Sequence, residues 1–147
     1  MADVPILTRA PLDPAAILAR LGSPDLGGTA LFIGSVRRSA EDGPVQAIEY
    51  SAYDAMAEAE GARIVAEAAV RWAGARVVLQ HRVGRVALGE SSVVVAAASP
   101  HRAEAFAACR YVIEEVKRRL PVWKKEIYEN GSAEWRANDG TRERAAP

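Results

Sequence analysis

Residues 116–126 read VKRRLPVWKKE, and within this stretch a long helix gives way to a strand. Pro121 ends the helix, because proline cannot continue one. Five cationic residues surround the break, with Lys117 near the helix end and Lys124 just beyond Pro121. Basic side chains on two backbone elements can converge on one point. We therefore expect this stretch to line a pocket for an anionic small molecule.

The helix that leads into Pro121 is predicted to begin at Ser99-Pro100 and to run to about Leu120. At about 100° per residue, one stripe of side chains is assigned to the core: Phe106, Cys109, Ile113, Val116 and Leu120. Lys117 lies about 60° from the centre of that stripe, and Arg110 falls on nearly the same line. A partly desolvated lysine beside another cation tends towards a lowered pKa, which suits a nucleophile or an acid–base group. The alternative is a lysine whose stem covers the core while its ammonium stays in water.

Outward from this stretch, hydrophobic periodicity predicts two further helices, at residues 14–21 and 54–73. Strands are predicted at residues 29–36, 45–53, 76–83, 91–98, 122–128 and 134–136. We expect the strand at 29–36, TALFIGSV, to be largely buried, and residues 84–89 to form a turn region. This order of elements indicates an α+β or α/β sandwich in which helices cover a mixed sheet, and we predict the α+β class.

Composition limits the functions open to the chain. Its 147 residues are half hydrophobic and suit a single domain, assigned to residues 1–137, with a disordered tail at 138–147. Nineteen basic residues balance nineteen acidic ones, which argues against a general nucleic-acid or membrane-binding surface. Cys109 is the single cysteine, so an intrachain disulfide and a multi-cysteine zinc site are excluded. We predict a cytoplasmic protein without signal peptide, membrane span or metal site.

Two further groups of basic residues are candidates to bind an anion. His101 and Arg102 fall in the first turn of the helix after Ser99-Pro100, where free backbone N–H groups favour negative charge. Residues 34–38 leave a strand for a polar loop, and an arginine at a strand end can bind a phosphate with two donors. Each group also has an explanation without a ligand. His101 and Arg102 can simply point into solvent, and an arginine at a strand end is common in proteins that bind nothing there.

Three other residues are weighed against simpler roles. Cys109 lies on the predicted core stripe, which favours a packed small side chain over a nucleophile. His81 lies in an alternating strand without a Cys, His or acidic partner at metal-ligand spacing. Trp123 could be a packing anchor or a stacking surface for a flat heterocycle.

Five stretches, in order, carry a resemblance to a known family: PLDP (11–14), FIGSVR (32–37), IEYSAYDAMA (48–57), HRVGRVALGESSVVVAAASPHRAEAFAACRYVIEEVK (81–117) and PVWKKE (121–126). On these motifs the chain resembles the large, catalytic subunit of molybdopterin synthase. The resemblance extends to Trp135, and the succession from HRVG to PVWKKE is highly specific.

The resemblance implies a sulfurtransferase of molybdenum cofactor biosynthesis that converts cyclic pyranopterin monophosphate to molybdopterin. The sulfur would come from the C-terminal Gly-Gly thiocarboxylate of a small ubiquitin-like partner subunit, whose tail inserts into the large subunit. A homodimer with a small subunit at each end, a heterotetramer, is also implied. So is an α/β hammerhead fold with an added antiparallel β subdomain. No cofactor is expected.

Carried over residue by residue, the family's essential lysines fall on Lys117 and Lys124. Its substrate-binding positions fall on Ser35, Val36, Arg37, His101, Arg102, Lys125 and Glu126. Part of the family's pocket comes from the other protomer, so His101 and Arg102 are candidates to act across the dimer. Arg37, His101 and Arg102 would hold the phosphate. Lys117 would meet the thiocarboxylate, and Lys124 would orient the pterin or stabilise an oxyanion.

Two alternatives from other classes fit the same basic residues. One is a non-catalytic anion-binding module that senses a phosphorylated metabolite. The other is an assembly protein that only docks a partner's tail. An enzyme should yield a dithiolene pterin when mixed with precursor and thiocarboxylated partner, whereas either alternative should bind without forming product.

Overall fold

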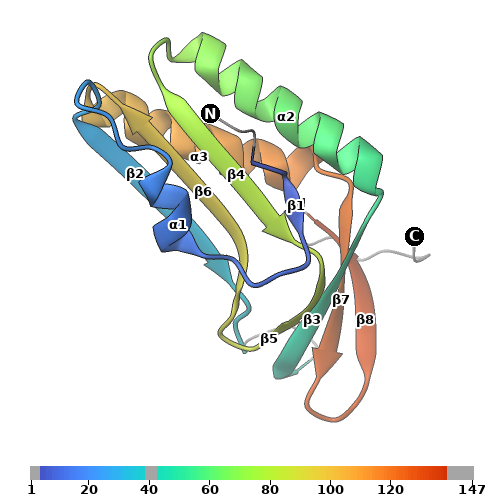
Figure 1. Ribbon diagram of the computed structural model, residues 1–147. Helices are drawn as coiled ribbons and strands as arrows, with labels where there is room; N and C mark the ends of the chain where they lie inside the picture. Colours follow the sequence, from blue (N-terminus) through green and yellow to red (C-terminus); the bar gives the residue numbers. More distant parts are fainter. Residues whose placement is uncertain (1–3, 39–42, 139–147) are drawn as a thin grey trace.

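The computed structural model describes residues 4–38 and 43–138, which form three helices and two four-stranded sheets (Figure 1). The helices are α1 (Pro14–Ala19), α2 (Asp54–Arg71) and α3 (Arg102–Arg119). The first sheet has the order β1 (Leu7–Thr8), β4 (Arg76–Arg82), β6 (Ser91–Ser99) and β2 (Gly28–Ser35). The second has the order β5 (Gly84–Ala87), β3 (Val45–Ala52), β7 (Val122–Tyr128) and β8 (Ala133–Ala137).

The first sheet is mixed, because β1 pairs parallel to β4 while the other pairs are antiparallel. Its strand β6 is buried from Ser92 to Ser99 because both faces of the sheet are covered. Val93, Val95 and Ala97 join the core beneath α2 and α3, and the residues between them pack on the side of α1. A strand covered on both faces needs no polar side, which explains the continuous run VVVAAA.

The second sheet is antiparallel throughout, and β7 enters it directly after α3 and Pro121. The β7–β8 hairpin turns at Gly131, whose φ of 89° lies in the region that favours glycine. Together the two sheets and the helices confirm the predicted α+β fold. Strands β1 and β5 were not predicted, because β1 has two residues and β5 lies in the glycine-flanked segment read as a turn region.

The buried stripe of α3 differs from the predicted one. Its buried residues are Ala105, Ala108, Cys109, Val112 and Val116. Phe106, which we assigned to the core, is 67% exposed. Helix α3 lies directly against β2 and β6, and alanines rather than the phenylalanine occupy the contact. Val116 stays in the stripe, so Lys117 borders it as expected.

The prediction that the strand at 29–36 is largely buried is wrong. Within β2 only Ala30 is buried, whereas Leu31, Phe32 and Ile33 are 40%, 38% and 40% exposed. The reason is that β2 is an edge strand of its sheet, so no strand of the described part of the chain lies along its outer side (Figure 1).

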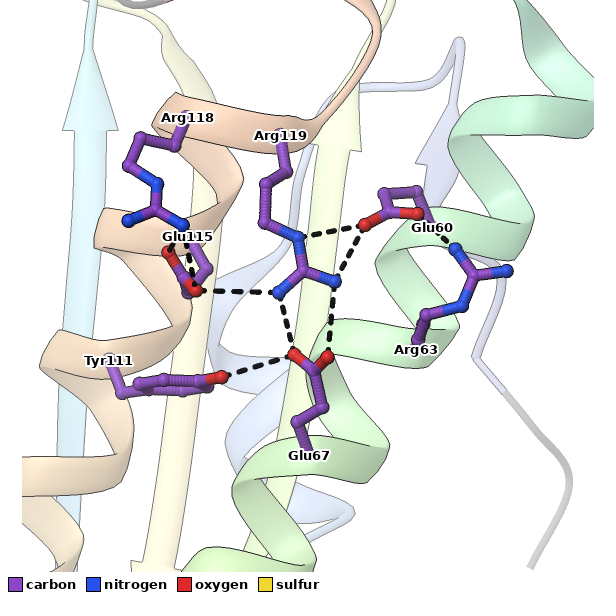
Figure 2. Close-up of polar contacts among 7 residues, drawn as sticks. All are labelled: Glu60, Arg63, Glu67, Tyr111, Glu115, Arg118 and Arg119. Carbon is purple, nitrogen blue, oxygen red and sulfur yellow. Dashed lines mark hydrogen bonds and ion pairs between the residues drawn. The ribbon is translucent and has the colours of Figure 1, made fainter.

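Arg119 joins the two long helices through an ionic cluster, drawn in Figure 2. From the last turn of α3 its guanidinium donates to Glu60 of α2 at 2.8 Å and to Glu67 of α2 at 2.6 Å. Tyr111 of α3 donates its hydroxyl to the same Glu67 at 3.1 Å. Arg119 therefore holds the end of α3 against α2. Arg118 is exposed and pairs with Glu115 within α3.

Asn138 is the first residue of the segment predicted to be a disordered tail. It is buried, and its side-chain amide donates to the carbonyl of Val116 in α3 at 2.9 Å. Asn138 is therefore ordered, contrary to the prediction, because this hydrogen bond ties it to α3. The rest of the predicted tail, 139–147, lies outside the described residues.

Candidate functional site

Lys117 and Lys124 lie on either side of the Pro121 break and act on each other electrostatically. Lys117 is half-buried beside the core stripe of α3, and Lys124 is half-buried in β7. Burial lowers the pKa of Lys117, and the positive charge of Lys124 lowers it further. The helix-to-strand change therefore brings two cations together at a desolvated position, as the sequence predicted for a convergent pair.

A buried aromatic pair lies beside the two lysines. Tyr50 of β3 is the cross-strand neighbour of Lys124, and its ring meets His81 of β4 edge to face at 5.0 Å. His81 is 1% exposed. Burial lowers its pKa to about 4; its bond with the Arg82 carbonyl opposes the shift, and the charges of Lys117 and Lys124 add to it. The imidazole is therefore neutral at physiological pH.

The tautomer of the His81 ring follows from the hydrogen bond that the ring makes. Its Nδ1 lies 2.8 Å from the carbonyl oxygen of Arg82, which can only accept, so Nδ1 carries the proton. Its Nε2 therefore keeps a lone pair, and this buried atom has no hydrogen-bond partner among residues 4–38 and 43–138. The sequence shows no metal-ligand spacing around His81 and no motif that assigns a role to Tyr50. The available signal was a histidine in place of an apolar residue in the strand RVVLQHR.

The end of β2 reaches the same region through Ser92 of β6. The Ser92 hydroxyl donates to the Gly34 carbonyl at 3.2 Å and is also hydrogen-bonded with Tyr50. Ser35 and Arg37 are exposed on either side of Val36. Val36 itself is buried, and its N–H and carbonyl are paired with Glu90 and Gly89. Val36 thus anchors the strand end, while its two neighbours remain open to a ligand.

Lys125 and Glu126 are separated by the alternation of β7. Lys125 faces away from Lys124, and its ammonium lies 6.0 Å from the centre of the Trp135 ring in β8. Glu126 is buried and forms an ion pair with Arg136 of β8 at 2.5 Å. Its carboxylate is therefore held by the protein. Of the two, only Glu126 shares the face of the lysine pair.

His101 and Arg102 lie far from the lysines within one chain. Both are exposed at the start of α3, and Lys117 is near its end. Sixteen residues of helix correspond to about 24 Å. One copy of the chain thus brings together Lys117, Lys124 and the end of β2, but not the first turn of α3.

Cys109 and Trp123 have packing roles. Cys109 is buried, and its thiol contacts the Val95 carbonyl at 3.6 Å. Burial raises the pKa of this thiol, which agrees with a packed side chain. Trp123 meets Tyr53 edge to face at 4.9 Å. Within residues 4–38 and 43–138, no three His, Cys, Asp or Glu side chains are grouped to bind a metal, and no helix is long and apolar enough to cross a membrane.

Two surface grooves lie away from the lysine pair. One of about 530 Å³ lies between α2, β4 and the segment before β1, and one of about 380 Å³ lies between α2 and α3. Neither is lined by any predicted site residue. The lysine region combines two half-buried cations with a buried, neutral imidazole on which both charges act. Such a surface can bind an anion, polarise a carbonyl group or exchange a proton.

Comparisons with known proteins agree with one another. Residues 7–119 match the family model described as MoaE protein. A molybdopterin synthase catalytic subunit from Aspergillus niger is 41% identical over 132 residues, covering 90% of this chain and 73% of that protein. The crystal structure of molybdopterin synthase from Staphylococcus aureus matches with a TM-score of 0.85 and 31% identity, covering 90% of this chain and 96% of that chain.

One further structure is similar in fold. It is a protein–protein complex of subunits 1 and 2 of molybdopterin-converting factor from Helicobacter pylori. Its matching chain has a TM-score of 0.71 at 21% identity, covering 96% of this chain and 92% of that one.

Proposed function

The chain belongs to the MoaE protein family, and we propose that its Lys117–Lys124 pair performs the sulfur transfer that forms molybdopterin. It is an enzyme of molybdenum cofactor biosynthesis, the catalytic subunit of molybdopterin synthase. The observation that carries the proposal is the half-buried Lys117, whose pKa is lowered by burial and by Lys124. A lysine in that state can give up or accept a proton near neutral pH more easily than an exposed one.

The substrate is cyclic pyranopterin monophosphate, and the sulfur donor is the C-terminal thiocarboxylate of a small ubiquitin-like subunit. The Helicobacter pylori complex of two converting-factor subunits supports a two-subunit assembly. Both reactants are anions, which suits a region with Arg37, Lys117 and Lys124 and no acidic residue free of a partner in β7. The exposed Arg37 at the end of β2 binds the phosphate.

The two lysines have different roles in the proposed reaction. The thiocarboxylate sulfur attacks a carbon of the pterin side chain, the bond from that carbon to an oxygen substituent breaks, and a thioester forms. Water then cleaves the bond between the acyl carbon and sulfur, either directly or after the acyl group has passed to the Lys117 amine, whose amide water hydrolyses. Lys117 is the proton-transfer group or transient acyl acceptor at that carbon. Lys124 lies beside the acyl oxygen and stabilises the negative charge that develops on it. The sulfur stays on the pterin, and the partner leaves as a carboxylate.

The same enzyme is proposed to be a homodimer that pairs through β2. Leu31, Phe32 and Ile33 give this edge strand three adjacent apolar side chains on the surface. An unpaired apolar edge strand is prone to pair with another chain. A second copy of β2 would cover these side chains and satisfy the free backbone groups of the edge.

Antiparallel pairing of two β2 strands would also complete the site. At the start of β2, a Cβ on Gly28 would lie 3.2 Å from the Cα of Arg102, whereas Ser35 is at its other end. The eight residues of β2 span about 23 Å, close to the distance along α3 from His101 to Lys117. A two-fold axis would therefore bring His101 and Arg102 of one protomer beside Arg37 of the other.

The test combines the purified chain with the precursor and the thiocarboxylated small subunit, and detects dithiolene pterin by mass spectrometry. The proposal predicts that two sulfurs appear on the pterin and that the partner returns as a carboxylate. The same mixture with a carboxylate-terminated partner is the control. Binding of both reactants without product would instead identify an anion-binding or docking module.

A further inference from the structure

We propose that His81 is a positioning residue for Lys117, whose ammonium it holds through the lone pair of Nε2 once substrate and the partner's tail exclude water. The inference rests on the proposed role of Lys117 in sulfur transfer. It concerns a side chain to which neither the resemblance nor the comparisons assign any role.

The ring of His81 is fixed on two sides. Its Nδ1–H donates to the Arg82 carbonyl at 2.8 Å, and Tyr50 packs edge to face against it at 5.0 Å. The Tyr50 hydroxyl is in turn hydrogen-bonded with Ser92, which donates to Gly34. An imidazole held in this way presents Nε2 in one direction, with no freedom to turn it towards another donor.

A buried acceptor without a donor is unfavourable, so Nε2 gains from any donor that can reach it. His81 is 1% exposed and its Nε2 has no partner within the described chain. Tyr50 on β3 packs against the ring, and the charges of Lys117 on α3 and Lys124 on β7 act on it. Glu126 on β7 acts on Tyr50. The charge of Lys117 acts on His81 more strongly than that of Lys124. Tyr50 is engaged with Ser92 and Glu126 with Arg136. Of the two lysines, Lys117 has the stronger effect on the ring, and its ammonium is therefore the donor in this proposal.

Neutrality of the ring is required for this role. Burial lowers the pKa of His81 to about 4, with the two lysines contributing. Above about pH 5 the ring therefore accepts a hydrogen bond. A protonated ring would be a third positive charge beside Lys117 and Lys124, and would repel both.

The test compares His81→Phe, which keeps a flat ring but removes Nε2, with His81→Gln, which restores an acceptor. The matched control is Leu79→Met, two residues earlier on the same buried face of β4. We expect His81→Phe to slow single-turnover sulfur transfer by about tenfold or more without raising the KM for the precursor. His81→Gln should recover most of that loss, and Leu79→Met should react as the wild type does.

A second readout does not depend on activity. The pKa of Lys117 is measured by NMR on ¹³C-labelled lysines in the complex with the small subunit, with Lys117→Arg assigning the signal. Loss of the acceptor should lower that pKa in His81→Phe, because the ammonium form loses a hydrogen bond. An unchanged rate together with an unchanged Lys117 pKa in His81→Phe would overturn the inference.

Two outcomes remain distinct from that failure. If His81→Phe does not fold, His81→Gln and His81→Asn are compared, and equal rates for these two acceptors of different reach contradict a positioning role. If the wild type forms no product at all, the proposed function fails, while the Lys117 pKa still decides the role of His81.

Discussion

The charged form of Lys117 destabilises the folded protein. Its stem borders the buried stripe of α3, and both burial and Lys124 disfavour its charged form. The same desolvation that destabilises the ammonium makes it useful as a proton-transfer group. Function and stability are therefore opposed at this position, as they often are at catalytic residues.

We predict that Lys117→Met raises the melting temperature by a few degrees at neutral pH while it removes activity. The direction of the change in stability follows from the lowered pKa. The folded state loses the Lys117 proton more readily than the unfolded state, in which the lysine pKa is near 10.5. Wild-type stability therefore rises with pH between the folded pKa and 10.5. The gain from methionine should shrink over that interval in thermal melts. A lower melting temperature than the wild type at pH 7 would contradict this account.

Among the elements, α3 links the core, the site and the neighbouring helix. Arg119 reaches Glu60, Glu67 and Glu115 from its last turn, two residues after Lys117 (Figure 2). Only 22% of the Arg119 side chain is exposed, so solvent screens this cluster less than an open surface pair. The cluster and the buried stripe together fix the rotation of the turn that carries Lys117.

Replacement of Arg119 by methionine should lower the melting temperature by several degrees, because Glu60 and Glu67 lose a shared partner across two helices. Arg110→Met is the matched control, since Arg110 is 84% exposed and its pair with Glu114 lies within α3. That control should change the melting temperature by a degree or less. Equal effects of the two substitutions in thermal melts would show that the Arg119 cluster does not clamp α2 to α3.

Sequence patterns predicted the helices and six strands because hydrophobic residues repeat along each of these elements with the period of a helix or a strand. Helical angle also placed Lys117 correctly at the edge of the buried stripe. The pattern failed where an apolar residue is not covered by its own chain: Phe106 on α3 and residues 31–33 on β2 are exposed. It also missed His81, because an isolated histidine in a strand carries no spacing signal until the fold puts the lysines beside it.

At the scale of the whole molecule, the described chain holds the two parts of the proposed site at opposite ends of α3. Lys117 and Arg37 lie at one end, and His101 and Arg102 at the other. The apolar edge of β2 runs between those ends, so the proposed dimer through this edge would account for both the exposed side chains and the separated residues.

Mixing two inactive variants tests the shared site. Lys117→Ala and Arg102→Ala homodimers should each be nearly inactive. After dissociation and random reassociation, half the dimers are mixed, and each mixed dimer has one intact site. The mixture should thus recover about a quarter of wild-type activity, since no residue in that site is changed. No recovery in a mixture that mass spectrometry shows to be exchanged would indicate that the two residues act within one chain, or that Arg102 has no role.

The central claim is that Lys117 performs the transfer, and its most direct test is one turnover of Lys117→Ala with thiocarboxylated partner and precursor. Arg118→Ala, at the adjacent exposed position on α3, is the matched control. The account predicts that Lys117→Ala folds, binds the partner as the wild type does, and forms no dithiolene pterin, while Arg118→Ala forms it normally. Near-normal product from Lys117→Ala would contradict the account.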